Sequence, residues 1–167
     1  VLEGYEVANF QSRGNDQVVD LTPGLWSIIG KNLDEGVSNG TGKSSMVRAL
    51  NVGLLGTSFS DVTVKEMRNR FGDGNPRIKI RLKVDDKPLH IDRIVGGRLA
   101  ATFDGKEIEG KNEDIQKVIM DTIGLTETQV NYLTNKAQGS FGGFLLMKDK
   151  DKKELLVRLE EMDYASG

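Results

Sequence analysis

The stretch Asn39-Gly40-Thr41-Gly42-Lys43-Ser44-Ser45 lies between an apolar run and a run with helical periodicity. The apolar run, residues 25–30 (LWSIIG), predicts a short buried strand, and residues 45–50 (SMVRAL) begin an amphipathic helix. A strand, a glycine-rich turn and a helix in this order are the context that a phosphate-binding loop needs. The glycines let backbone N–H groups point at phosphate oxygens, and the helix N-terminus adds partial positive charge. We therefore predict a nucleotide site at this loop.

Two side chains of the loop would contact the nucleotide directly. Lys43 would reach the β- and γ-phosphates, and the Ser44 hydroxyl would hold Mg2+. The backbone from Asn39 to Ser45 would form the rest of the cradle. The competing interpretation is a glycine turn without a ligand, because a Gly-Lys-Ser sequence alone is common.

The loop departs from the usual pattern in its first half. The pattern G-x-x-x-x-G-K-[ST] would place its first glycine at position 37, where this chain has Val37. We interpret Gly30 as the opening of the loop and residues 32–38 as an insertion. Because Asp34 and Glu35 are unfavourable beside a triphosphate, we expect the inserted residues to loop outward into solvent.

The composition is that of an ordinary globular domain. The 167 residues suffice for one domain, with 37% apolar residues, 29% charged residues and a formal net charge of −2. This balance argues against a protein that coats DNA, and the absence of cysteine excludes disulfides and thiolate metal sites. No apolar run approaches the about 20 residues that span a membrane, and residues 1–4 (VLEG) lack signal-peptide character. We expect a cytoplasmic protein with no membrane partner.

The clearest periodic stretch is residues 77–84 (RIKIRLKV), in which basic and apolar residues alternate. A period of two predicts a half-buried antiparallel strand. Residues 89–95 predict the returning strand, and Asp104-Gly105 between two short runs predicts a hairpin turn. We therefore expect an antiparallel meander in this part of the chain, with His90 as a structural histidine.

The basic side of residues 77–84 has two interpretations. It is either a solvated strand face, the commoner case, or a strip that contacts DNA phosphates without reading the sequence. The strip consists of Arg77, Lys79, Arg81 and Lys83. Basic residues near enough in the sequence to extend it are Arg68, Arg70, Arg93 and Arg98.

Further elements are predicted on both sides of the loop and the meander. They are strands at residues 2–10 and 17–21 and helices at residues 64–70, 112–124 and 126–133. The last of these opens with Thr126 and Gln129 at capping-box spacing. A final helix, starting near residue 151, carries Leu155, Leu159 and Met162 at heptad spacing, over too short a length to establish a coiled coil.

Several features arrive together in one order along the chain. They are a strand ending at residues 9–12 (NFQS), the phosphate loop, the meander, residues 137–145 (AQGSFGGFL) and a charged helix. This order closely resembles the N-terminal ATPase lobe of SbcC-type DNA repair ATPases. That family is related to the structural-maintenance-of-chromosomes (SMC) proteins and the ABC ATPases, and the phage recombination endonuclease subunits belong to the same group.

The resemblance covers nearly the whole chain and implies its fold. The expected fold class is α/β: a P-loop NTPase, the N-terminal lobe of an ABC-type ATPase head, with an antiparallel β-meander and flanking helices. Residues 1–56 would hold strands, the P-loop and the first helix, residues 57–110 the meander, and residues 111–148 helices and the Q-loop. Residues 149–163 would be the root of a coiled-coil arm, and residues 164–167 a tail or linker.

The resemblance also implies roles for single residues. Gln138 matches the Q-loop glutamine, which contacts Mg2+ and helps to place the attacking water. It would join Lys43 as a catalytic residue and Ser44 as a metal ligand. Ser12 and Arg13 match a stretch near the base and phosphates of the nucleotide, so they join the expected ATP-binding residues.

The second lobe of the family's head carries motifs that this sequence lacks. These are the Leu-Ser-Gly-Gly signature, an apolar strand ending in Asp-Glu and a switch histidine. Phosphoryl transfer needs an oriented water and countercharge around the γ-phosphate, so this chain alone should bind ATP but hydrolyse it poorly. The resemblance implies as partners a C-terminal lobe of the same ATPase, a second ATPase head joined through ATP, an SbcD-type nuclease and double-stranded DNA.

Two other functions compete with this one. The first is another P-loop class, such as a GTPase or a small-molecule kinase. Residues 135–138 (NKAQ) lack the Asp of the guanine-reading Asn-Lys-x-Asp motif, which argues against a GTPase. The second is a non-catalytic binding module in which nucleotide only stabilises the fold.

Overall fold

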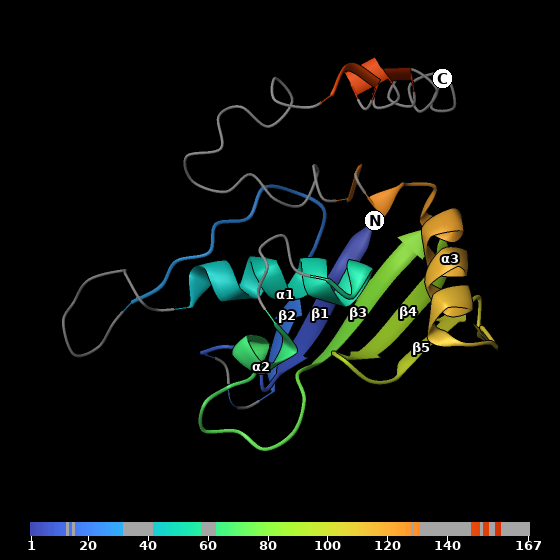
Figure 1. The fold of residues 1–167 in the computed structure, drawn as a ribbon. Coiled ribbons are helices and arrows are strands. Elements are labelled where there is room, and N and C mark those ends of the chain that lie inside the picture. Colours follow the sequence, from blue (N-terminus) through green and yellow to red (C-terminus); the bar gives the residue numbers. More distant parts are fainter. Residues whose placement is uncertain are drawn as a thin grey trace. The chain divides into compact units, whose positions relative to one another are not determined.

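The computed structural model of the chain describes most of the residues before position 131 and short pieces after it. The described residues are 1–12, 14, 16–31, 42–57, 63–127, 129–130, 148–150, 152–153 and 156–157. The chain divides into two compact units, Val1–Leu125 and Thr126–Gly167. The sheet and its helices all belong to the first unit (Figure 1).

The described strands form one antiparallel sheet in the order β2-β1-β3-β4-β5-β6 (Figure 1). Their bounds are β1 Leu2–Ala8, β2 Gln17–Asp20, β3 Arg77–Val84, β4 Lys87–Ile94, β5 Leu99–Phe103 and β6 Lys106–Glu107. The predicted meander is therefore confirmed, and β1 joins it by pairing with β3. Asp85 and Asp86 connect β3 to β4 with φ angles of 48° and 60°, the left-handed conformation of a two-residue hairpin. The predicted turn at Asp104 likewise joins β5 to β6.

Helices cover one face of the sheet. They are α1 Lys43–Leu55 and α3 Asn112–Ile123, with the short α2 Val64–Met67 near the end of β1. Helix α1 packs against β1, β3 and β4, and α3 packs against β5 (Figure 1). The apolar side chains between these layers form the core. Those that are almost completely buried include Phe10, Val52, Ile78, Ile80, Leu89, Ile91 and Ile119.

Helix α1 lies unusually close to β3 because of one glycine. A Cβ atom on Gly53 would lie 2.6 Å from Cγ2 of Ile78 and 2.7 Å from Cδ1 of Ile80. Contacts this short do not occur between carbon atoms, so any larger residue would push the helix away from the sheet. The alternating apolar residues of β3 and this glycine together fix the height of α1 above the sheet.

The predicted strand at residues 25–30 is wrong for this structure. These residues have no assigned secondary structure, and their large apolar side chains are exposed: Leu25, Trp26, Ile28 and Ile29. A continuous apolar run forms a strand when neighbouring strands take up its hydrogen bonds and layers cover both its faces. The strands of the described sheet pair with one another and leave this segment without a neighbour among the described residues.

The predicted C-terminal ends of α1 and α3 are confirmed, whereas the helical turn predicted near residues 64–70 ends already at Met67. Gly56 and Gly124 end α1 and α3 in left-handed conformations, with φ angles of 77° and 73°. The capping box of the second unit is also present: the Thr126 N–H donates to Oε1 of Gln129 at 2.8 Å, and the Gln129 N–H donates to Oγ1 of Thr126 at 3.3 Å. Residues 149–150, 152–153 and 156–157 are helical. Leu155, Leu159 and Met162 lie outside the described residues.

Candidate nucleotide site

The N-terminal end of α1 coincides with residues 42–45, the last part of the predicted phosphate loop. Gly42 precedes the helix with a φ angle of 78°, a left-handed conformation that glycine adopts without strain. The helix then begins at Lys43, and the Met46 N–H donates to the Gly42 carbonyl at 3.3 Å. Gly42, the residue before the helix, has no side chain that could cap the first turn. The N–H groups of a helix N-terminus that follows a glycine can face an anion.

The side chains at this end suit a negatively charged ligand. Lys43 and Ser45 are half-buried, and Ser44 is exposed. The first turn of α1 contains no acidic residue, so nothing there opposes the partial positive charge of the helix terminus. Gly42, Lys43, Ser44 and Ser45 lie at this end of the helix, and their contacts with a nucleotide stay predictions.

The C-terminal end of α1 is closed by buried polar groups. The Gly56 N–H donates to the Val52 carbonyl at 2.7 Å. Nε of Arg93, on β4, donates to the Gly53 carbonyl at 2.9 Å, and Nε2 of Gln116, on α3, donates to the Leu54 carbonyl at 3.0 Å. Nη2 of Arg93 also donates to the Gln116 side chain.

Arg93 therefore does not extend the basic strip, although its position in the sequence had suggested that it would. Only 8% of this residue is exposed, and it lies on the helix-covered face of the sheet. A cation at the C-terminus of a helix also compensates the negative end of the helix dipole. Arg93 is a structural position that the sequence analysis misassigned to the exposed strip. The signal was its register, because in period-two alternation it falls on the same side as Leu89 and Ile91.

Ser12 lies in the turn that follows β1. The preceding residues Asn9 and Gln11 have left-handed φ angles of 52° and 50°, and hydrogen bonds hold them there. The Gln11 N–H donates to the Met67 carbonyl at 2.7 Å, and Nδ2 of Asn69 donates to the Gln11 carbonyl at 2.7 Å. Ser12 itself is exposed and directly follows this hydrogen-bonded segment.

The remaining predicted site residues cannot be placed. Arg13, Asn39, Gly40, Thr41 and Gln138 lie outside the described residues, and so does the predicted insertion at residues 32–38. Their assignments stay predictions.

The basic strip on β3 is paired residue by residue with carboxylates of other strands, namely β1, β2 and β4. The pairs are Arg77–Asp92 at 2.5 Å, Lys79–Glu6 at 2.7 Å, Arg81–Asp20 at 2.5 Å and Lys83–Glu3 at 2.8 Å. All lie on the face of the sheet that α1 and α3 leave uncovered. The Arg77 guanidinium, bonded to both oxygens of Asp92, lowers the pKa of that carboxyl. Because each cation has a counterion, the strip is close to neutral, and DNA contact there stays a sequence-based proposal.

A magnesium site at this loop would rely on few protein ligands. The described residues contain no group of three or more His, Cys, Asp or Glu side chains that could hold a metal ion. The Ser44 hydroxyl supplies one exposed oxygen at the N-terminal end of α1. This fits Mg2+, which proteins commonly bind through one or two side chains while phosphates and waters fill its other positions.

No helix among the described residues is long and apolar enough to cross a membrane.

Comparison with known proteins places the chain in one family. The model of the AAA domain family matches residues 6–165. No curated protein matches the chain.

Several solved structures share its fold, and they are SMC heads. A chain from a structural study of ATP-driven dimerization and DNA-stimulated activation of SMC ATPases has a TM-score of 0.61 at 18% identity, covering 95% of this chain and 98% of that one. The Smc head of Pyrococcus furiosus, bound to the C-terminal domain of ScpA, has a TM-score of 0.64 at 18% identity, covering 92% and 40%. The Smc head of Pyrococcus yayanosii has a TM-score of 0.58 at 17% identity, covering 98% and 33%. The chain thus spans well under half of the two Pyrococcus heads.

Proposed function

The chain belongs to the AAA domain family and has the fold of the N-terminal lobe of an SMC- or SbcC-like ATPase head, from which we propose that it is the ATP-binding half of such a head. One observation carries the proposal: α1 begins directly after a left-handed Gly42 and has no acidic residue in its first turn. Backbone N–H groups and a helix dipole directed at one point form a phosphate site.

Individual residues of the loop would divide the work. Lys43 would neutralise charge on the β- and γ-phosphates, and the N–H groups of the first turn would bind phosphate oxygens. Ser44 and, from the Q-loop, Gln138 would hold Mg2+, which would neutralise charge on the transferred group. Ser12 and Arg13 would contact the nucleotide from the turn after β1.

Hydrolysis would require a second lobe. The exposed apolar segment at residues 25–30 supports this, because four large apolar side chains side by side in the sequence are costly to leave in water. A C-terminal lobe that pairs with this segment would turn it into the buried strand that its sequence predicts. That lobe would bring the signature motif and the acidic strand, and ATP would then join two heads into a dimer.

The biological role that we propose is processing of DNA ends with an SbcD-type nuclease in double-strand break repair and recombination. The support is the resemblance of the sequence to SbcC-type ATPases, and a cytoplasmic, nucleoid-associated protein would suit this role. Double-stranded DNA would be the substrate of the assembled complex.

A nucleotide titration with and without the C-terminal lobe tests the proposal. The chain alone should bind ATP more tightly than GTP and hydrolyse it slowly, and addition of the C-terminal lobe should raise the hydrolysis rate. Equal or tighter binding of GTP would favour another P-loop class. ATP binding without any gain in hydrolysis on adding the lobe would favour a non-catalytic module.

A further inference from the structure

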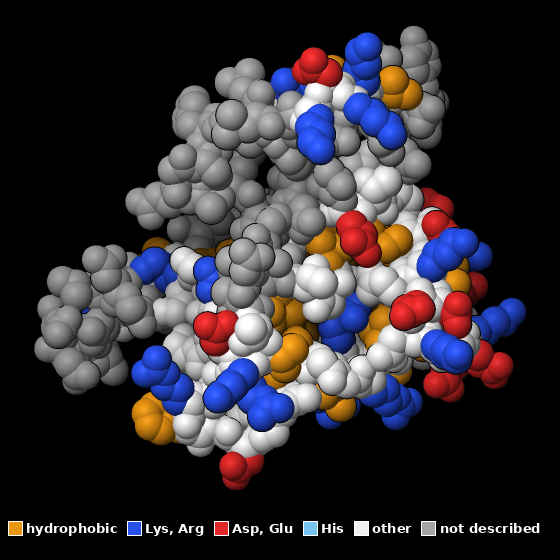
Figure 2. Space-filling model, viewed as in Figure 1, with side chains coloured by type: hydrophobic (Ala, Val, Ile, Leu, Met, Phe, Trp, Pro, Cys, Tyr) orange, Lys and Arg blue, Asp and Glu red, His pale blue; other side chains and the backbone are white. Residues whose placement is uncertain are grey.

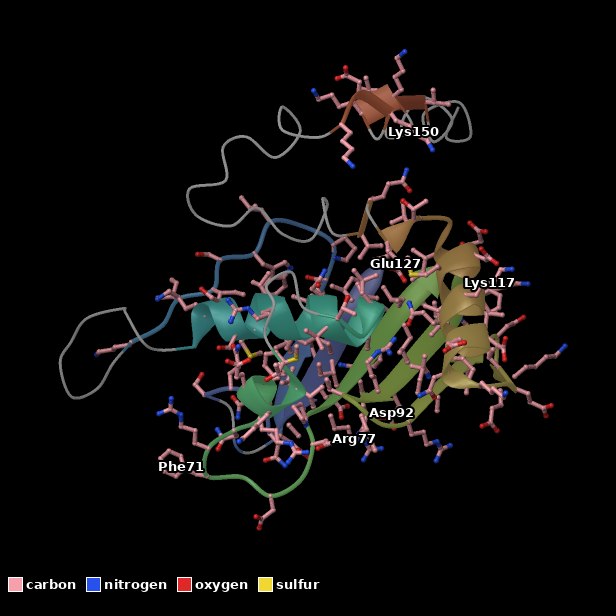
Figure 3. The ribbon with its side chains drawn as sticks, viewed as in Figure 1. Phe71, Arg77, Asp92, Lys117, Glu127 and Lys150 are labelled. Atoms are coloured by element: carbon pink, nitrogen blue, oxygen red, sulfur yellow. The ribbon has the colours of Figure 1, made fainter. Side chains whose placement is uncertain are left out.

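The loop between α2 and β3, residues 68–76, projects an aromatic ring into solvent. Phe71 is 97% exposed, and its ring points away from the ribbon (Figure 3). Arg68 and Arg70, which both precede Phe71 in the sequence, are exposed as well. Basic side chains gather over α2 and this loop beside a hydrophobic one in the space-filling view (Figure 2). We name this the Phe71 loop.

The positive charge of the Phe71 loop is less compensated than that of the basic strip. Arg68 donates to the neutral side-chain oxygen of Asn75, which leaves its charge in place. Among the residues that the structure describes, no carboxylate forms an ion pair with Arg70, and Asp73 is the only acidic residue in the loop. The loop therefore offers two exposed arginine side chains and one exposed ring.

The backbone of the Phe71 loop is held in place although its tip is exposed. The Phe71 N–H donates to Oδ1 of Asn69 at 2.8 Å, and the Asn69 N–H donates to the Asn9 carbonyl at 2.9 Å. Nδ2 of Asn9 donates to the Asp73 carbonyl at 2.6 Å. Gly72 sits so close to Asn9 that a Cβ atom would lie 2.2 Å from its Oδ1. Because the loop is already ordered, a ligand would lose little binding energy to ordering it.

We propose that the Phe71 loop binds single-stranded nucleic acid, with Phe71 stacking on an unpaired base and Arg68 and Arg70 contacting the flanking phosphates. An aromatic ring can stack on any base. Guanidinium groups bind phosphates and carboxylates equally well, so the two arginines alone would fit either a nucleic acid or an acidic peptide. The exposed ring favours the nucleic acid, because a run of acidic side chains offers no flat surface to Phe71.

The loop is also tied to the proposed nucleotide site. Asn69 bonds to both Asn9 and Gln11, the segment that leads into Ser12. A nucleic-acid strand bound at the Phe71 loop and a nucleotide bound near Ser12 would therefore both contact parts of one hydrogen-bonded segment. This connection rests on the proposed function, whereas the contacts of the loop with a strand do not.

The test is binding of the full chain, without nucleotide, to a fluorescent single-stranded 20-mer DNA and to its blunt duplex at 50 mM salt. Phe71→Ala should weaken single-strand binding about tenfold and leave duplex binding unchanged. Arg70→Gln should weaken both and reduce the salt dependence of log K by about 0.7 for the single strand. Lys117→Gln, on the exposed side of α3, is the matched control and should change neither.

Three results would overturn the proposal. They are no binding of the single strand, unchanged binding after Phe71→Ala, and competition by polyglutamate that is as effective as competition by unlabelled oligonucleotide. Thermal unfolding of each variant controls for the fold, which an exposed substitution should not alter. Loss of ATP binding by the chain with intact oligonucleotide binding would count against the proposed function alone.

Discussion

The two ends of α1 differ in how their terminal backbone groups are satisfied. At the C-terminal end, the Gly56 N–H, Arg93 and Gln116 bind the last carbonyls, and the polar groups are buried. At the N-terminal end, the helix follows Gly42, which has no side chain that could cap it. Every helix has such unpaired groups at both ends, so the contrast lies in what the protein does with them.

The proposed function gives the two ends of this helix different roles. Groups paired within the protein at the C-terminal end stabilise the fold, whereas the N-terminal end, which follows a glycine, would bind the ligand. Substitutions at the C-terminal end should therefore lower the free energy of unfolding with little effect on nucleotide affinity. Substitutions at the N-terminal end should do the reverse.

The largest loss of stability is expected from Arg93→Met. It removes the donor to the Gly53 carbonyl inside the protein, and the unpaired groups that remain should lower the free energy of unfolding by about 3 kcal/mol. Urea unfolding measures this. Arg98→Met changes the same residue type at an exposed position and should cost less than about 0.5 kcal/mol. Equal losses in the two variants would contradict the buried role of Arg93.

Gly53→Ala should have the next largest effect. The added methyl group would lie 2.6 Å from Cγ2 of Ile78, so α1 must move away from the sheet, at a cost of about 2 kcal/mol. Alanine favours helices over glycine, so a helix that was free of this contact would gain stability instead. The sign of the change in urea unfolding therefore separates the two explanations. An Ile80→Val substitution in the same protein, which removes the Cδ1 atom that would lie 2.7 Å from the added methyl group, should recover part of the loss.

The smallest effect is expected on the uncovered face of the sheet. Arg77 lowers the pKa of Asp92, so the ion pair contributes stability above the usual carboxyl pKa of about 3.9, and this contribution disappears as the pH falls through the lower folded-state value. Because both side chains are partly exposed, the contribution should be at most about 1 kcal/mol. Asp92→Asn should remove it, so stability measured from pH 6 to pH 2 should fall less steeply than in the wild type. Identical slopes would show that the pair contributes nothing.

The sequence predicted the covered and uncovered faces of the sheet well because period-two alternation records burial directly. The strand at β3, the hairpin turn at Asp104 and the ends of α1 and α3 were all readable from local chemistry, and the family and fold agree with the resemblance. The basic strip was misleading on its own, because its counterions come from other strands and only the register of Glu6 and Asp92 shows them.

The segment at residues 25–30 was mispredicted for a different reason. Its apolar run records an environment that other strands must supply, and the described sheet does not supply it. The hydrogen bonds of the Asn69 side chain could not be predicted from the sequence. An asparagine in a loop is the same letter whether its amide bonds to the backbone or to water.

The most direct test of the central claim is titration of ATP into the wild type, Lys43→Ala and Lys117→Ala, with urea unfolding of each. Lys43→Ala should weaken ATP binding at least about tenfold, because a charge-assisted contact to phosphate is lost. Its free energy of unfolding should stay within about 0.5 kcal/mol of the wild type, and Lys117→Ala should change neither property. Unchanged ATP affinity in a folded Lys43→Ala variant would contradict the account.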